Sequence, residues 1–168
     1  MSNSLRDKVV VVTGASSGIG RSIALESASR GATVILMARH QDKLEEIANE
    51  ARQLSGNEVY VFPTDISKAD QIDRAFNEIV SHVDHIDYLV NAAGFGVFKE
   101  FLETSPQVVT EMFQTNVLGL MYFTRLVARV MIDQKQGQII NFGSIAGIVP
   151  TTKTAAYSAT KAAIIQFS

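Results

Sequence analysis

The sequence contains no cysteine and no tryptophan among its 168 residues, and only three prolines. Without cysteine, the chain can form neither disulfides nor thiolate metal sites. Basic residues are not in excess, since 15 Lys and Arg stand against 17 Asp and Glu, and they are scattered rather than gathered in a run. These absences exclude a disulfide scaffold and argue against a nucleic-acid partner.

Long apolar runs are missing too. The most apolar later stretch, VLGLMYFTRLVARVMI, is interrupted by Arg125 and Arg129 and is too short to span a bilayer. The start, MSNSLRDK, lacks the apolar segment of a signal peptide. With 46% hydrophobic residues the chain can still bury a core. We therefore expect a globular, cytoplasmic protein that has no membrane partner.

Five short runs rich in β-branched residues alternate with helical patterns. The runs cover residues 8–13, 33–38, 58–62, 87–92 and 137–142, and most are apolar throughout, as in parallel strands buried on both faces. Apolar residues recur at helical spacing over 44–54 and 72–83. A longer helix is predicted over 106–132, with Thr104 or Ser105 as its cap. The alternation predicts an α/β fold with a doubly wound, Rossmann-like parallel sheet, in a single domain over residues 1–168.

The first predicted strand leads into TGASSGIG, residues 13–20. Gly14, Gly18 and Gly20 allow a tight turn, a close backbone approach to a phosphate and tight packing of helix on strand. A helix beginning here would point its free N–H groups and positive dipole end at the loop, which suits a pyrophosphate. A glycine-rich turn that binds nothing is the alternative. The position between first strand and first helix favours a dinucleotide site.

Five motifs in order make the chain resemble the short-chain dehydrogenases/reductases. TGASSGIG resembles that family's TGxxxGxG loop, and NAAG at 91–94 resembles its NNAG motif, with Ala92 in place of the usual second Asn. Asn116 matches the family's helix asparagine, GSIAG at 143–147 the segment with the catalytic serine, and YSATK at 157–161 the YxxxK motif. In the family more chain follows. The resemblance therefore implies a fold truncated after the fifth strand and the start of the YxxxK helix.

Reduction of a carbonyl needs a hydride, which a nicotinamide cofactor supplies, and a proton. Tyr157 and Lys161 are four residues apart, so on a helix they share a face, where the lysine cation favours the phenolate. The resemblance implies that Tyr157 donates or accepts the proton and that Lys161 also holds the nicotinamide ribose. It further implies that Ser144 polarises the carbonyl and that Asn116 holds a water in a proton relay to Lys161. Taken singly, each of these residues is as readily structural.

The second predicted strand ends in LMARH, where this fold holds the adenosine ribose of a dinucleotide. An acidic residue there would hold the 2′-hydroxyl of NAD. The chain instead has Ala38 and then Arg39, and an Arg suits the 2′-phosphate of NADP. Arg39 as a merely solvated residue is the alternative. We expect NADP(H) rather than NAD(H), with hydroxyl contacts from Ser16 and Ser17.

The resemblance adds two further segments to the cofactor site. Asp65 would hydrogen-bond the adenine, although it could also stand at a helix start that Ser67 caps. The segment 91–94 would run past the adenine ribose, or form a plain turn at a strand end. The predicted cofactor residues are Gly14, Ser16, Ser17, Gly18, Ile19, Gly20, Arg39, Asp65, Ile66, Asn91, Ala92, Ala93, Gly94, Tyr157 and Lys161.

The implied activity is that of an NADP(H)-dependent oxidoreductase that interconverts a carbonyl and a secondary alcohol. The alternative is a non-catalytic NADP(H)-binding fragment or regulatory protein. The substrate is a small molecule whose identity stays open, although Phe95, Val97, Phe98, Ile148, Val149 and Pro150 predict an apolar component of its pocket. Family members commonly pair the Asn116 and Tyr157 helices, which implies a homodimer or homotetramer. We predict that His40, His82 and His85 are surface residues, with no metal site.

Overall fold

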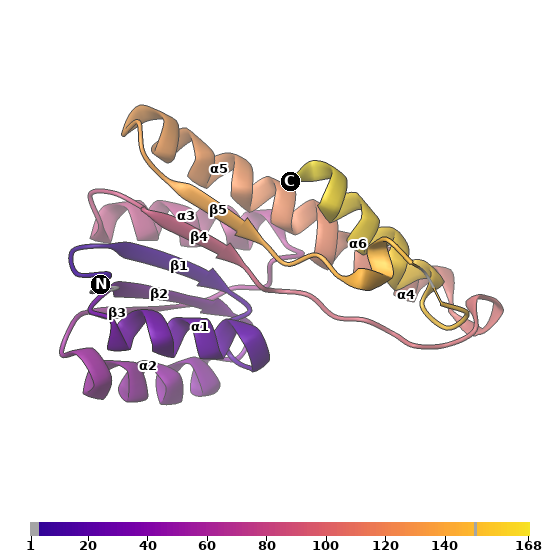
Figure 1. Ribbon diagram of the computed structural model, residues 1–168, viewed down its shortest axis with the longest axis horizontal. Helices are drawn as coiled ribbons and strands as arrows, with labels where there is room; N and C mark the ends of the chain where they lie inside the picture. Colours follow the sequence, from indigo (N-terminus) through magenta and orange to yellow (C-terminus); the bar gives the residue numbers. More distant parts are fainter. Residues whose placement is uncertain (1–3, 150) are drawn as a thin grey trace.

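The computed structural model describes residues 4–149 and 151–168, so Pro150 lies outside the described residues. Five parallel strands form one sheet in the order β3-β2-β1-β4-β5 (Figure 1). They are β1 (Val9–Thr13), β2 (Thr33–Ala38), β3 (Val59–Pro63), β4 (Tyr88–Asn91) and β5 (Gln138–Asn141). All five predicted strands are present. The strand order reverses at β1, which confirms the predicted doubly wound α/β fold.

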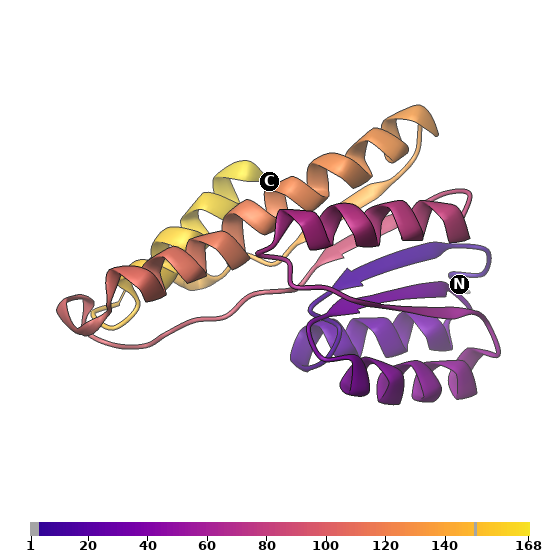
Figure 2. The same ribbon diagram turned by 180° about the vertical axis from the view of Figure 1, so that it is seen from behind.

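Helices cover both faces of the sheet. They are α1 (Gly18–Ser29), α2 (Gln41–Ser55), α3 (Ala69–His82), α4 (Pro106–Phe113), α5 (Leu120–Asp133) and α6 (Ala155–Phe167). Helices α1 and α2 lie on one face, and α3 and α5 on the other (Figures 1 and 2). Along β1, Val10 and Val12 pack in the hydrophobic core on the α1 and α2 face, while Val9 and Val11 pack in the core on the α3 and α5 face. A strand buried on both sides must be apolar at every position, which explains the continuous valine run.

The long helix predicted over 106–132 is helical throughout but not uniformly α-helical. Ser105 caps α4 by accepting a hydrogen bond from the Val108 N–H at 3.3 Å. A π-helix (Gln114–Gly119) then separates α4 from α5. Its last residue, Gly119, lies against the loop after β3, where an added Cβ would stand 2.0 Å from the Ile66 carbonyl oxygen. The interruption therefore brings the helix backbone into contact with the edge of the sheet.

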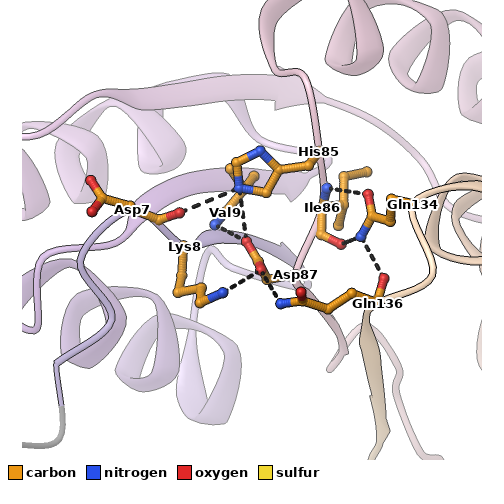
Figure 3. Close-up of polar contacts among 8 residues, drawn as sticks. All are labelled: Asp7, Lys8, Val9, His85, Ile86, Asp87, Gln134 and Gln136. Carbon is orange, nitrogen blue, oxygen red and sulfur yellow. Dashed lines mark hydrogen bonds and ion pairs between the residues drawn. The ribbon is translucent and has the colours of Figure 1, made fainter.

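At the amino ends of the strands, the Asp87 carboxylate binds donors from neighbouring segments (Figure 3). The Asp87 side chain is 5% exposed and accepts hydrogen bonds from Lys8 Nζ at 2.8 Å, the Val9 N–H at 2.9 Å and Gln136 Nε2 at 3.2 Å. His85 Nε2 lies 3.1 Å from its Oδ2 atom. Burial would raise the pKa of Asp87, but the hydrogen bonds from Lys8 and Val9 outweigh burial and hold it below its usual value.

His85 was predicted to be a surface residue, and its side chain is 45% exposed, although its ring also belongs to this carboxylate network. His40 and His82 are exposed, as predicted. Across the described residues, no helix combines the length and apolarity needed to cross a membrane.

Candidate active site

A cavity of about 440 Å³ opens at the carboxyl ends of the strands, opposite the Asp87 network. Its walls come from the β1–α1 loop, the end of β2 and the segments after β3 and β4. They hold most of the predicted cofactor residues: Gly14, Ser16, Ser17, Gly18, Ile19, Gly20, Arg39, Asp65, Ile66, Ala92, Ala93 and Gly94. Motifs that lie almost eighty residues apart in the chain therefore meet around one space.

Glycines are needed around this cavity, because backbone segments pack there so closely that no side chain would fit. Gly14 has φ +67°, and a Cβ there would lie 2.7 Å from the backbone nitrogen of Ala93. A Cβ on Gly20 would lie 2.4 Å from the Gly14 carbonyl oxygen. Ser17 is the N-cap of α1 and makes no side-chain capping bond. The first-turn N–H groups of α1 and an uncommitted hydroxyl thus border the cavity, as a bound pyrophosphate requires.

The end of β2 carries the cation predicted to select NADP. Arg39 lines the cavity, and within residues 4–149 and 151–168 no acidic side chain forms an ion pair with it. The last residue of β2, Ala38, is uncharged. The end of β2 thus carries a positive group and no carboxylate of its own.

Asp65 lines the cavity from the segment after β3. Its Oδ1 accepts hydrogen bonds from the Ser67 N–H at 3.0 Å and the Ser67 hydroxyl at 2.8 Å, which form a tight turn. Helix α3 begins only at Ala69, with Lys68 as its N-cap, so the suggested Ser67 cap is wrong. The turn fixes Asp65 at the cavity wall.

Asn91 was predicted to belong to the cofactor site, but it does not line the cavity. It is 3% exposed, and its Nδ2 donates to Thr124 Oγ1 and to Asn141 Oδ1, both at 2.9 Å. Because Asn91 and Asn141 are partners in the β4–β5 register, the side chain joins the two strands to α5. Its Oδ1 is buried and has no hydrogen-bond partner among the described residues, and a contact between Asn91 and a cofactor stays a prediction.

Tyr157 and Lys161 lie one turn apart on α6, as their spacing predicted. Lys161 Nζ is 5.8 Å from the centroid of the Tyr157 ring and donates to the Phe142 carbonyl oxygen at 2.7 Å. Lys161 is 8% exposed, and this burial lowers the pKa of its ammonium below the usual value. A cation with little water around it would interact strongly with any negative charge that forms on the neighbouring tyrosine.

Ser144 lies at the start of a 3₁₀ turn (Ile145–Gly147) after β5, where its Oγ accepts a hydrogen bond from the Ala146 N–H at 3.1 Å. The turn packs directly on α6, since a Cβ on Gly147 would lie 2.7 Å from the carbonyl carbon of Lys161. The Ser144 hydroxyl hydrogen remains free to be donated, because the oxygen acts only as acceptor in this contact.

Asn116 is fully buried in the π-helix. Its Oδ1 accepts from the Phe95 N–H at 2.9 Å, and its Nδ2 donates to the Phe95 carbonyl at 2.8 Å and to Thr160 Oγ1 at 3.1 Å. Both amide hydrogens are therefore used, and the side chain clamps the loop after β4 to α6. One acceptor position remains on the amide oxygen, and the water relay stays a prediction.

The profile of the short chain dehydrogenase family matches residues 8–168. The chain belongs to this family. Among its relatives, 11-beta-hydroxysteroid dehydrogenase-like 5 of Arabidopsis thaliana is 37% identical, with 97% of this chain and 42% of the relative covered. An uncharacterized oxidoreductase of Staphylococcus aureus (strain MRSA252) is 36% identical, with 95% and 68% covered. The chain thus spans between 42% and 68% of the length of these two curated relatives.

Solved structures of the family share the fold closely. A xylitol dehydrogenase bound to NAD⁺ has a TM-score of 0.93 at 30% identity, with 97% of this chain and 63% of that protein covered. A metagenomic short-chain oxidoreductase in complex with NADP has a TM-score of 0.92 at 34% identity, with 99% and 75% covered. The two neighbours differ in the cofactor they hold, so the fold alone does not choose between NAD and NADP.

Several residues of this short-chain dehydrogenase site were missed by sequence reasoning. Thr13, Met37, Ala38, His40, Thr64 and Thr115 also line the cavity, as does Phe95, which was predicted for the substrate pocket and not for the cofactor site. Four of them, including Thr13 and Thr64, stand at or next to the last residue of a strand, so their positions alone could have indicated them. The Phe95 and Thr160 partners of Asn116 had no such signal, because only the tertiary fold brings them together.

Proposed function

We propose that this short-chain dehydrogenase is an NADP(H)-dependent oxidoreductase that interconverts a carbonyl and a secondary alcohol, with Tyr157 as proton donor and acceptor. The observation that carries the proposal is the buried ammonium of Lys161 beside the Tyr157 ring. It lies at the end of the sheet where the cavity opens. A tyrosine is a poor proton donor at neutral pH unless a nearby cation favours its phenolate.

Bound NADPH would supply the hydride for reduction. The residues around the cavity fit this cofactor. The Gly14–Gly20 loop would receive the pyrophosphate, Arg39 the 2′-phosphate, and Asp65 the adenine. The carbonyl oxygen would accept hydrogen bonds from the Ser144 and Tyr157 hydroxyls, and the Tyr157 proton would pass to it as negative charge develops there. The buried Lys161 cation would stabilise the phenolate that Tyr157 leaves behind.

We further propose that residues 1–168 act as one domain, and that copies of the protein pair through the helical run that contains Asn116 and through α6. Apolar side chains on these elements support this pairing, because Leu118 is 51% exposed, Met121 38% and Phe167 39%. Apolar groups exposed together on helices are a usual sign of an interface.

A specific observation favours the binding-only alternative for these 168 residues. None of Asn116, Ser144, Tyr157 and Lys161 lines the 440 Å³ cavity, which is formed by cofactor-site residues. On this alternative, the chain binds NADP(H) but turns nothing over.

Tyr157→Phe separates the two functions. If the chain is catalytic, NADPH-dependent carbonyl reduction falls by roughly 10²–10⁴-fold, because the proton donor is gone. NADPH affinity stays within about twofold. Absorbance of NADPH measures turnover, and titration of its fluorescence measures binding. Tyr60→Phe, on the edge strand β3, is the matched control and keeps full activity. Turnover that survives in Tyr157→Phe contradicts the mechanism, and tight NADPH binding by a wild-type chain without turnover supports the alternative.

A further inference from the structure

The Thr160 hydroxyl makes two hydrogen bonds in the interior of the protein. Thr160 lies next to Lys161 on α6 and is fully buried. Its Oγ1 donates to the Tyr157 carbonyl oxygen at 2.7 Å and accepts from Asn116 Nδ2 at 3.1 Å. The first bond is common, because threonine hydroxyls in helices often bind a carbonyl three or four residues earlier. The second bond is not local, because Asn116 lies 44 residues before Thr160, in the π-helix.

The two hydrogen bonds of this hydroxyl fix each other's direction. A carbonyl oxygen can only accept, so the single hydroxyl hydrogen of Thr160 is used on Tyr157. The oxygen then offers a lone pair to Asn116, which only an N–H can bind. This orients the amide with Nδ2 toward α6 and Oδ1 toward the Phe95 N–H. Without the hydroxyl, one amide hydrogen of Asn116 would be buried without a partner, at a cost in free energy.

The same amide holds the loop that packs on the Tyr157 ring. Asn116 Nδ2 also donates to the Phe95 carbonyl oxygen at 2.8 Å. At the next residue, Gly96, a Cβ would lie 2.9 Å from Cδ2 of Tyr157, so the loop backbone lies directly against the ring. One side chain thus holds both the loop and the tyrosine, the loop directly and the backbone of Tyr157 through Thr160.

The position of a proton donor decides how well it works. A general acid must come within hydrogen-bond distance of the oxygen that it protonates, and a misplacement of about 1 Å can lower a rate by about 10²-fold. Thr160 does not line the cavity that holds the predicted cofactor residues. An effect of its hydroxyl on the reaction therefore has to pass through the residues that it binds.

We infer that Thr160 is a positioning residue, whose hydroxyl holds the backbone of Tyr157 to Asn116 and so sets where the Tyr157 hydroxyl stands relative to the loop after β4. This inference rests on the proposed function. Thr160→Val keeps the shape of the side chain but can make neither hydrogen bond. Thr160→Ser keeps the hydroxyl and loses only a methyl group. A role in packing alone would favour valine, whereas a role in hydrogen bonding favours serine.

The test compares these two variants in the 168-residue chain, with Tyr122→Phe as the control. Tyr122 lies on α5, and its hydroxyl donates to Asp73 Oδ1 on α3 at 2.6 Å, so the control also removes a hydroxyl hydrogen bond between two helices. The first readout is kcat and the KM for NADPH in the reduction of ethyl acetoacetate. The second is the NMR signal of Tyr157 in a chain whose tyrosines carry ¹³C at Cζ. The sequence has four tyrosines, and Tyr157→Phe identifies the signal.

We expect Thr160→Val to lower kcat by about 10- to 100-fold and to leave the KM for NADPH within about twofold of wild type, because the proton donor shifts while the cofactor site does not. Its Tyr157 signal should shift or split. Thr160→Ser should keep kcat within about threefold of wild type, with the wild-type signal. Tyr122→Phe should change neither readout.

Wild-type kcat and an unchanged Tyr157 signal in Thr160→Val overturn the inference. Equal losses in Thr160→Ser and Thr160→Val also overturn it, because packing would then be the cause. A lower kcat with an unchanged signal does so too, because Thr160 would then not act through Tyr157. If the wild-type chain shows no turnover, the catalytic proposal fails, and the Tyr157 signals of the variants alone decide the inference. Should Thr160→Val not fold, Thr160→Cys replaces it against Thr160→Ser, because a thiol is only a weak hydrogen-bond partner.

Discussion

The two ends of the sheet treat polar groups in opposite ways. At the amino ends, Asp87 accepts hydrogen bonds from donors on two segments, Lys8 and Val9 on one and Gln136 on the other (Figure 3). At the carboxyl ends, Arg39 lines a cavity without a carboxylate partner among the described residues, and Ser17 makes no capping bond. The same strands thus end in a satisfied network on one side and in uncommitted groups on the other.

The difference separates stability from binding. Polar groups that are already partnered have little to offer a ligand, whereas uncommitted donors and cations can bind one. Substitutions at the amino ends should therefore change the free energy of unfolding and leave cofactor affinity alone. Substitutions at the carboxyl ends should change affinity, and should change stability only where backbone packs on backbone.

Gly20→Ala should have the largest effect, because it is expected to damage both properties. The new methyl would overlap the Gly14 carbonyl oxygen, so the loop must shift, at a cost of about 3 kcal/mol in unfolding free energy. NADPH affinity should fall at least about 100-fold, since the loop holds the pyrophosphate. Urea unfolding and NADPH titration measure the two quantities. Gly56→Ala is the control: unlike Gly20, Gly56 has a positive φ (+68°), but an added Cβ there meets nothing within 4 Å, so the substitution should cost only about 1 kcal/mol. Equal losses in both variants would contradict steric overlap as the cause.

Asp87→Asn should destabilise the chain without touching the cavity. The amide keeps the shape but removes the charge, and its NH2 group must face the donor of either Lys8 or Val9. We expect a loss of about 2–3 kcal/mol in unfolding free energy, with NADPH affinity within twofold of wild type. Asp70→Asn, at an exposed pair with Arg74, is the control and should leave stability unchanged. A large change in NADPH affinity would contradict the separation of stability at the amino ends from cofactor binding at the carboxyl ends.

Arg39→Ala should act only at the carboxyl ends. Loss of a charge-assisted contact to the 2′-phosphate should weaken NADPH binding by about tenfold or more, while NADH binding should change little. The ratio of the two dissociation constants is the measurement, and Arg74→Ala is the control for loss of a surface charge. Equal weakening of NADPH and NADH binding would show that Arg39 does not contact the 2′-phosphate. Unfolding free energy in the absence of cofactor should not change.

Acid should remove part of the stability that Asp87 contributes at the amino ends of the strands. Because the folded-state pKa of Asp87 lies below its unfolded value near 3.9, its stabilisation is present above about pH 5 and is lost as pH falls through the folded pKa. The gap in unfolding free energy between wild type and Asp87→Asn should therefore narrow, by at most about 0.7 kcal/mol, from about pH 5.5 to pH 3.5. Unfolding curves at several pH values measure the gap. A gap that widens in acid would mean that the pKa of Asp87 is raised rather than lowered.

The parts of the fold that sequence predicts well are those that local pattern controls. The continuous valine run of β1 predicts a buried strand, and the glycines of residues 13–20 predict a tight loop. Neither prediction needs information about distant residues. The pairing of Tyr157 with Lys161 likewise follows from helical spacing alone. These features therefore appear in the structure at the predicted positions.

The parts that sequence did not predict depend on contacts across the fold. The hydrogen bonds of the Asn91 side chain were not predicted, because its partners Thr124 and Asn141 come from elements far along the chain. The carboxylate network of Asp87 joins residues about eighty positions apart. The two-sided clamp of Asn116 on Phe95 is equally non-local. No periodicity or spacing carries such pairings.

The π-helix between α4 and α5 corresponds to one extra residue in the helical run. A π-turn accommodates one more residue than an α-turn, and each residue of an α-helix turns the side chains by about 100°. Deleting the half-exposed Leu118 would let the run close as a regular α-helix, at little cost to the core. Because the π-turn holds the extra residue, α4 and α5 would keep nearly the same relative rotation after the deletion, and the change would fall on the turn itself. Asn116 lies in that turn, so its amide would move relative to Phe95 and Thr160. A single residue of length, rather than any one side chain, thus places the amide that holds the loop after β4 to α6.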